Sequence, residues 1–218
     1  MTGPAGVVAF LFTDLVGSTA LIDRLGDDAA DEVRRSHFEL LRRAVAEAGG
    51  QEVKNLGDGL MVSFVSPVAA LSCATTMQRA MADSGLELRV GPHAGEPALE
   101  GDDYFGTPVV VAKRLCDLAR GGQIVASELL AGFVGTRGGF RFRPLGKLPL
   151  KGLSEPLAAV EVDLGPAVAD RAGSAQARLR QLPLVRAIRP RGPGLVGRDK
   201  EVAVLESELA AAVAGELR

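Results

Sequence analysis

Asp14 is the first residue whose setting suggests chemistry. It follows a β-favouring apolar run at 6–13 and precedes Val16, Gly17, Ser18 and Thr19, where a helical pattern begins. A carboxylate beside a turn whose free N–H groups open a helix can bind a cation and the phosphates that accompany it. An alternative interpretation is that Asp14 or Ser18 only caps the helix.

Asp58 is the second such residue, and it lies between two glycines in the turn of a predicted hairpin. The strands of this hairpin are QEVKN at 51–55 and LMVSF at 60–64. Asp-Gly is also a common turn pair, so a simple turn residue is the alternative. If the hairpin tip meets the end of the first strand, the two carboxylates can share a pair of divalent ions. Such sites catalyse in-line phosphoryl displacement.

The spacing of apolar residues predicts the elements that must position these aspartates. Helices are expected at 18–48, 67–84 and 107–119. Strands are expected at 6–13, 51–55, 60–64, 87–97, 121–127, 139–146 and 156–163, with a loop at 97–105. The order favours an α+β fold, a ferredoxin-like βαββαβ sandwich with extra C-terminal strands.

Composition limits the classes of protein that fit. The 218 residues suffice for one domain and an appendage, and the net charge of −2 produces no field that would attract nucleic acid or an anionic membrane. No stretch reaches about 18 uninterrupted apolar residues, so no transmembrane segment is expected. Cys73 and Cys116 lie in apolar or helical patterns without metal-binding spacing, as expected of reduced thiols in a cytoplasmic protein.

The composition changes after Leu164. Residues 166–196 are rich in Arg, Pro and Gly and are predicted to be a linker, while 197–218 form an amphipathic helical pattern. LVGRDKEVAVLESEL resembles the opening of AAA-type or STAND ATPase domains. No GxxxxGK[ST] motif follows it, so no ATPase activity is expected.

Four motifs occur in a characteristic order: FTDLVGST, VKNLGDGLMVSF, RVGPHAGEP and GDDYFGTPVVVAKRL. Together they resemble the motif set of class III adenylyl and guanylyl cyclases, over about residues 5–163. The resemblance implies a cyclase catalytic domain at 1–165, working as a homodimer in which each active site uses residues of both subunits.

The resemblance also assigns roles to individual residues. Asp14 and Asp58 match the two metal-binding aspartates, which implies two Mg²⁺ or Mn²⁺ ions per site. Lys54 and Asp103 match the pair that recognises the base, and Arg114 matches the arginine that stabilises the transition state. Taken singly, each of the last three residues has a simpler interpretation as a solvated surface charge.

Lys54 and Asp103, the pair expected to recognise the base, favour ATP over GTP. A lysine ammonium can only donate hydrogen bonds, which suits N1 of adenine, while a carboxylate accepts from the exocyclic amine. In guanine, the donor and the acceptor at these two positions are exchanged. The expected function is therefore conversion of ATP to 3′,5′-cyclic AMP and pyrophosphate.

Val110 departs from the family pattern, because an asparagine that orients the ribose usually occupies this position. Valine offers no such hydrogen bond, so slow turnover is expected. Two alternatives stay open: a catalytically silent nucleotide-binding module, and a phosphodiesterase or polymerase-like phosphoryl enzyme. His93 is interpreted as structural, because a lone histidine without a second ligand seldom binds metal.

Overall fold

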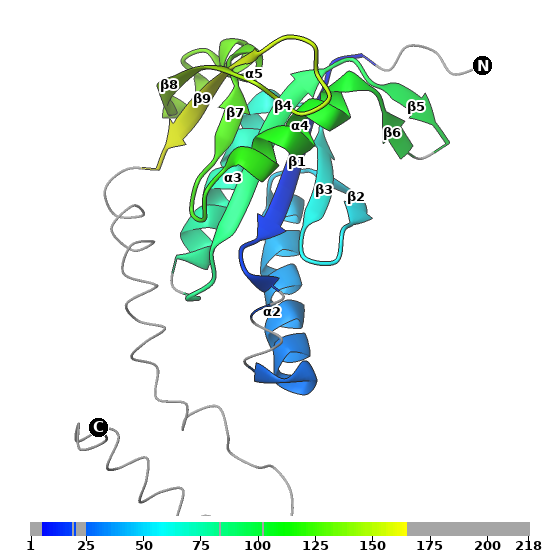
Figure 1. Cartoon of the computed structure of the whole chain (residues 1–218), viewed down its shortest axis with the longest axis vertical. Helices are drawn as coiled ribbons and strands as arrows, with labels where there is room; N and C mark the ends of the chain where they lie inside the picture. Colours follow the sequence, from blue (N-terminus) through cyan, green and yellow to red (C-terminus); the bar gives the residue numbers. More distant parts are fainter. Residues whose placement is uncertain (1–5, 19, 21–24, 83, 102, 165–218) are drawn as a thin grey trace, which may run out of the picture. The chain divides into compact units, whose positions relative to one another are not determined.

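The computed structural model describes residues 6–18, 20, 25–82, 84–101 and 103–164 (Figure 1). The expected linker at 166–196 and the expected helix at 197–218 lie outside these residues, as does Thr19. No helix in the described part of the chain is long and apolar enough to cross a membrane.

A four-stranded antiparallel sheet forms the centre of the fold. It consists of β1 (Val8–Leu15), β2 (Gln51–Asn55), β3 (Leu60–Phe64) and β4 (Leu88–Gly95), in the order β2-β3-β1-β4. This is the strand order of a ferredoxin-like fold, so the predicted α+β class is confirmed. Pro92, which has no N–H to donate, lies on β4 at the edge of this sheet, where proline is tolerated.

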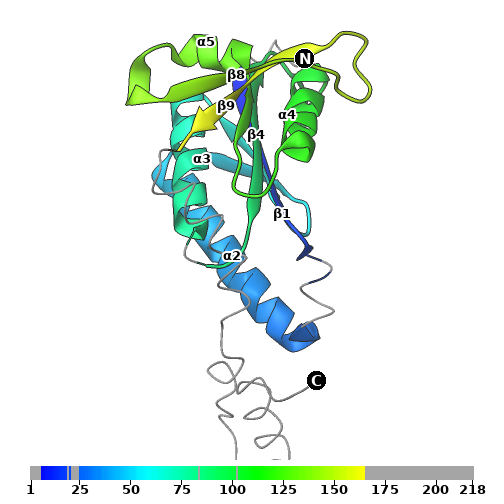
Figure 2. The ribbon, with the colours of Figure 1, turned by 60° about the vertical axis from the view of Figure 1, so that its left-hand side comes forward.

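Helices cover both faces of the sheet (Figure 2). α2 (Asp27–Glu47) and α3 (Pro67–Met81) pack on one face, and α4 (Thr107–Leu118) packs on the other. The alternation of side chains along β1 explains this arrangement. Ala9 and Leu11 join the larger core beneath α2 and α3, whereas Phe10 and Phe12 join a smaller core against α4.

A second sheet follows, with the order β7-β9-β8. Its strands are β7 (Val125–Ser127), β8 (Arg141–Leu148) and β9 (Leu157–Asp163), and α5 (Glu128–Val134) and the 3₁₀ turn η1 (Arg137–Gly139) precede β8. A single parallel bridge between Val90 and Ile124 connects β4 to this region. These strands are the C-terminal extension that the element order predicted.

The structure differs from the sequence-based expectation at three places. The expected loop at 97–105 contains a short hairpin of β5 (Ala98–Glu100) and β6 (Asp103–Phe105), whose strands are too short for alternation to reveal. α5 was not predicted, because its seven residues span only two turns. The helix expected at 18–48 is divided at Gly26, whose φ of 76° interrupts the helical backbone: Ser18, Ala20 and Leu25 are helical, and α2 runs from Asp27.

Candidate active site

The end of β1 and the β2–β3 turn lie against each other. The Leu15 N–H donates to the Asp58 carbonyl at 3.1 Å, and the Leu60 N–H donates to Thr13 Oγ1 at 2.8 Å. A Cβ atom at Gly59 would lie 1.8 Å from the Thr13 carbonyl oxygen, so only glycine allows this approach. The segments that carry Asp14 and Asp58 are therefore neighbours, as the predicted topology required.

Both carboxylates already have polar partners. Asp58 Oδ2 accepts a hydrogen bond from Ser18 Oγ at 3.0 Å. Asp14 Oδ2 accepts from Arg89 Nε at 2.8 Å and also from a second guanidinium nitrogen of Arg89. The Asp14 side chain is only 14% exposed, so the arginine compensates its charge in a partly desolvated place.

Arg89 is a residue that the sequence reasoning missed. A signal was available, because Arg89 is the only charged residue in β4, a strand whose other positions are mostly buried. A charge on such a strand needs a partner, and the register places Arg89 directly opposite Asp14.

The turn after β1 was expected to offer free N–H groups, and the structure agrees only in part. The Val16 N–H donates to the Glu87 carbonyl at 2.9 Å, so it is not a free donor. Gly17 adopts a φ of 70°, which lets the chain reverse and brings Ser18 to Asp58. Thr19 lies outside the described residues.

Two carboxylates can hold magnesium here with help from a substrate. The described residues contain no cluster of three or more His, Cys, Asp or Glu side chains suited to a metal ion. Mg²⁺, however, is usually bound in nucleotide enzymes by one or two carboxylates, with phosphate and water oxygens completing the shell. The hard oxygen donors of Asp14 and Asp58 fit that pattern.

Lys54 and Asp103 form a second cluster. Lys54 Nζ lies 2.5 Å from Asp103 Oδ2 and 5.4 Å from the centre of the Phe105 ring. The β5–β6 hairpin brings Asp103 there, and Tyr104 anchors the hairpin by an edge-to-face contact of 5.2 Å with Phe10. The structure thus brings together the two residues predicted to recognise the base.

Arg114 belongs to a third cluster, on α4. Its Nη1 lies 3.2 Å from Asp117 Oδ2, and its Nε donates to the Lys151 carbonyl at 3.1 Å. Lys151, in the turn between β8 and β9, contributes only its backbone carbonyl, and the sequence reasoning missed this contact. No hydrogen bond or ion pair within the described ranges joins Arg114 to Asp14, Asp58 or the Lys54–Asp103 pair.

Val110 lies on the same helix as Arg114, one turn earlier. Its side chain is 40% exposed, and its N–H donates to the Gly106 carbonyl at 3.3 Å. The exposed surface at this position is apolar.

His93 is structural, as predicted. Its ring is buried, and Nδ1 lies 2.7 Å from Ser127 Oγ, which also caps α5 by accepting from the Leu130 N–H. Burial lowers the pKa of His93 to about 4, so the imidazole is neutral near pH 7.

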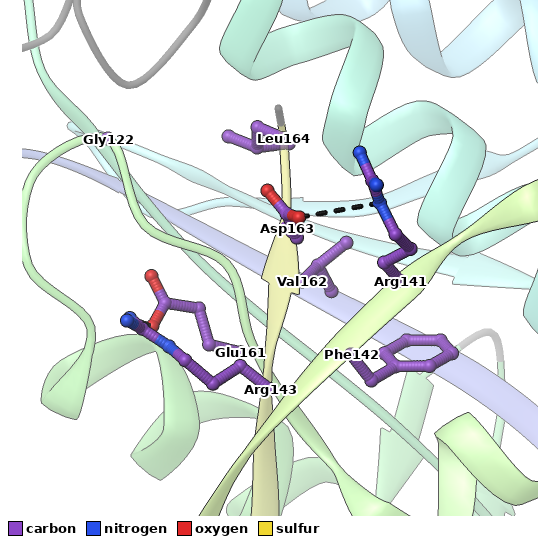
Figure 3. Close-up of a pocket in the computed structure, with 8 residues that line it drawn as sticks. All are labelled: Gly122, Arg141, Phe142, Arg143, Glu161, Val162, Asp163 and Leu164. Carbon is purple, nitrogen blue, oxygen red and sulfur yellow. Dashed lines mark hydrogen bonds and ion pairs between the residues drawn. The ribbon is translucent and has the colours of Figure 1, made fainter. Parts of the chain in front are cut away.

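Two cavities differ in their relation to these clusters. One, of about 490 Å³, borders the Asp58 turn and is lined by Leu15, Ser18, Asp27, Ala30, Asp31, Arg34, His37, Leu56, Gly57 and Asp58. The other, of about 510 Å³, lies on β8 and β9 (Figure 3). There Arg141 pairs with Asp163 and Arg143 with Glu161, and none of the predicted site residues contributes.

Comparison with known proteins identifies the family. The family described as "Adenylate and Guanylate cyclase catalytic domain" matches residues 2–161. The chain belongs to this cyclase family. The match covers all three clusters and ends inside β9.

Individual relatives agree with the assignment. An adenylate cyclase of Mycosarcoma maydis is 38% identical over 168 residues, which cover 61% of this chain and 7% of that enzyme. An uncharacterized protein of Mycobacterium tuberculosis is 32% identical over 156 residues, covering 70% of this chain and 54% of the relative. The cyclase chain thus spans from 7% to about half of the length of these relatives.

A solved structure confirms the fold. An adenylate cyclase of Trypanosoma brucei, described in its monomeric state, superposes with a TM-score of 0.69 at 25% identity, covering 76% of this chain and 93% of the other. The cyclase fold of the described residues is therefore established.

Proposed function

We propose that this cyclase domain converts ATP to 3′,5′-cyclic AMP and pyrophosphate. The observation that carries the choice of ATP is the contact between Lys54 and Asp103, 2.5 Å apart beside the exposed ring of Phe105. The ammonium can only donate and the carboxylate can only accept, which complements the N1 and exocyclic amine of adenine. A buried mismatch with guanine can reduce reactivity by a factor of about 10⁴ or more.

Asp14 and Asp58 would hold two Mg²⁺ or Mn²⁺ ions, because their segments lie side by side and their oxygens suit hard cations. Bound there, the ions supply charge neutralisation at the phosphates and acidify the ribose 3′-hydroxyl. Arg89 offers a planar, bidentate guanidinium at the same place, which matches phosphate oxygens in geometry and charge. Val16, Gly17 and Ser18, with Thr19 after them, are the proposed phosphate-binding turn, in which the Val16 N–H holds the turn to the Glu87 carbonyl rather than donating to phosphate.

The reaction itself is an in-line displacement. The 3′-hydroxyl oxygen attacks the α-phosphorus and loses its proton, while the bond to the bridging oxygen of pyrophosphate breaks. Arg114 is proposed to bind the charge that develops on these oxygens. Its guanidinium is held by Asp117 through Nη1 and by the Lys151 carbonyl through Nε.

A homodimer explains why the clusters are separate. In one chain, no hydrogen bond or ion pair between described residues connects the Asp14–Asp58 cluster to Lys54, Asp103 or Arg114. We propose that these three residues complete the site of a second copy, and that two equivalent sites form across a two-fold interface.

A second candidate function rests on Val110. An exposed valine at the position proposed to orient the ribose presents only methyl groups. If the resulting loss of orientation is complete, the domain is a catalytically silent module that binds nucleotide and regulates or dimerises other parts of a longer protein.

The decisive experiment is to incubate the purified protein with ATP or GTP and Mn²⁺ and to separate the products chromatographically, alongside Asp14→Ala. Cyclic AMP that disappears in the variant supports the proposal. Cyclic GMP as the main product would refute the base assignment. Pyrophosphate without any cyclic nucleotide would favour another phosphoryl enzyme, and nucleotide binding by a dimer without product would favour the silent module.

A further inference from the structure

His37 is a polar side chain that is buried on helix α2. It lies on the inward face of α2 and is only 3% exposed. Among the described residues, neither of its ring nitrogens has a hydrogen-bond partner, and no other buried side-chain nitrogen or oxygen shares this condition. The ring of Phe38, the next residue, lies 5.3 Å away in an edge-to-face arrangement and offers no hydrogen-bond acceptor.

An unsatisfied buried imidazole is unfavourable, because its polar atoms have lost water without gaining another partner. Such a group needs an explanation. His37 lines the 490 Å³ cavity together with Leu56, Gly57 and Asp58 of the β2–β3 turn. The buried imidazole and the turn that carries a proposed metal ligand therefore line the same cavity.

Among the acidic residues that line the cavity, Asp58 is the candidate partner of His37. Asp31 and Arg34 are bound to each other at 3.1 Å, and Asp27 lies in the exposed first turn of α2. Burial lowers the pKa of His37 by more than the nearby Asp58 carbonyl and carboxylate raise it. The ring is therefore neutral near pH 7 and has one N–H donor.

The Asp58 carbonyl has capacity for a second hydrogen bond. It accepts one from the Leu15 N–H at 3.1 Å, and a carbonyl oxygen has two lone pairs. Its carboxylate, in contrast, is bound by Ser18 and is the group proposed to face the cation. A donor that acts on the carbonyl from the α2 side would fix the turn without competing for the carboxylate.

We propose that His37 is a positioning residue for the metal site, whose imidazole N–H donates to the Asp58 backbone carbonyl and fixes the β2–β3 turn when a cation is bound. The inference rests on the proposed metal role of Asp58. It does not require that the enzyme turn over.

The test measures Mn²⁺ binding without catalysis. The full chain is titrated with Mn²⁺ in the presence of 3′-deoxy-ATP, which has no attacking hydroxyl, and free Mn²⁺ is followed by electron paramagnetic resonance. His37→Phe removes the donor and keeps a ring of similar size, and it should raise the Mn²⁺ dissociation constant about 10-fold, or about 1.4 kcal/mol. His37→Gln restores a donor and should recover at least half of that change on a logarithmic scale.

Two controls separate positioning from general stability. Arg34 lines the same cavity, but its side chain is paired with Asp31. Arg34→Ala should therefore leave the Mn²⁺ affinity unchanged. Thermal unfolding of each variant without metal reports the fold, and His37→Leu replaces the Phe variant if that one does not fold.

Wild-type affinity in the Phe or Leu variant would overturn the inference, and so would equal losses in the apolar and Gln variants. Absence of Mn²⁺ binding by the wild-type chain would overturn it together with the metal role of Asp58. Mn²⁺ binding that depends on Asp14 and His37, together with no cyclic nucleotide when the wild-type chain is incubated with ATP and Mn²⁺, would support the inference while refuting the proposed catalysis.

Discussion

Arg89 on β4 lies directly opposite Asp14 on β1 and donates to its carboxylate through two guanidinium nitrogens. The pair joins the two strands at the edge of the proposed metal site. Arg89 therefore compensates the charge of Asp14 in the free protein, and under the proposed function its guanidinium binds the nucleotide phosphates.

Replacing Arg89 by Ala should affect catalysis and stability together. Loss of a phosphate-directed guanidinium should lower kcat/KM for ATP about 10²-fold. Loss of the charged hydrogen bonds to Asp14 should lower the free energy of unfolding by about 2 kcal/mol. Steady-state kinetics and urea denaturation measure the two effects.

Arg89→Lys provides the control, since it retains the charge without the bidentate geometry. It should recover much of the stability and only part of kcat/KM. If Arg89→Ala lost stability but kept its kcat/KM, Arg89 would be a structural residue alone.

The two glycines that flank Asp58 should respond differently to a methyl group. Gly59→Ala places a Cβ atom against the Thr13 carbonyl and should lower the free energy of unfolding by about 3 kcal/mol. Gly57→Ala has open space but a φ of 96°, and should cost only about 1–2 kcal/mol. Chemical denaturation of both variants compares them, and equal losses would contradict the close approach of β1 and the hairpin.

The sequence predicts the central fold because each of its elements has a strong local signal. Apolar alternation and runs reveal β1, β3 and β4, and Pro67, a residue favoured in a first helical turn, places the start of α3 correctly. The short hairpin β5–β6 and the helix α5 have too few residues to show periodicity.

The candidate site was predictable only where residues belong to recognisable motifs. The meeting of Asp14 with the Asp58 turn follows from topology, and the structure shows it. The contacts of Arg89 with Asp14, and of Lys151 with Arg114, depend on strand register and on the path of a turn. Neither can be read from local sequence. The catalytic roles of all these residues remain proposals.

Stability should decrease in acid because of His93. Its pKa is about 4 in the folded protein and near 6.5 when unfolded, so between these values the unfolded chain binds a proton that the folded chain does not. Stability therefore falls as the pH drops from 6.5 towards 4, by about 3 kcal/mol at most from this residue. Denaturation midpoints across this range should fall less in His93→Gln, and parallel profiles for both proteins would contradict the assignment.

Base selectivity should depend on Lys54 and Asp103. The double variant Lys54→Glu with Asp103→Cys removes the donor for N1 and the acceptor for the amine, and introduces groups that suit guanine. The ratio of kcat/KM for ATP over GTP should fall by a factor of about 10² or more. Competition assays with both nucleotides measure the ratio, and Arg79→Ala on α3 provides a control that should leave it unchanged. Unchanged selectivity in the double variant would remove the base assignment.

Val110→Asn should accelerate the enzyme if the absence of a ribose contact limits it. Val110 is 40% exposed on α4, so the amide can replace the isopropyl group without disturbing the core, at a helix cost of a few tenths of a kcal/mol. An oriented hydrogen bond to the reacting sugar should raise kcat about 10²-fold. Val110→Ala shortens the side chain without adding a donor, and should show no gain. A rise in both variants would point to steric relief, whereas no rise in Val110→Asn would mean that another step limits turnover.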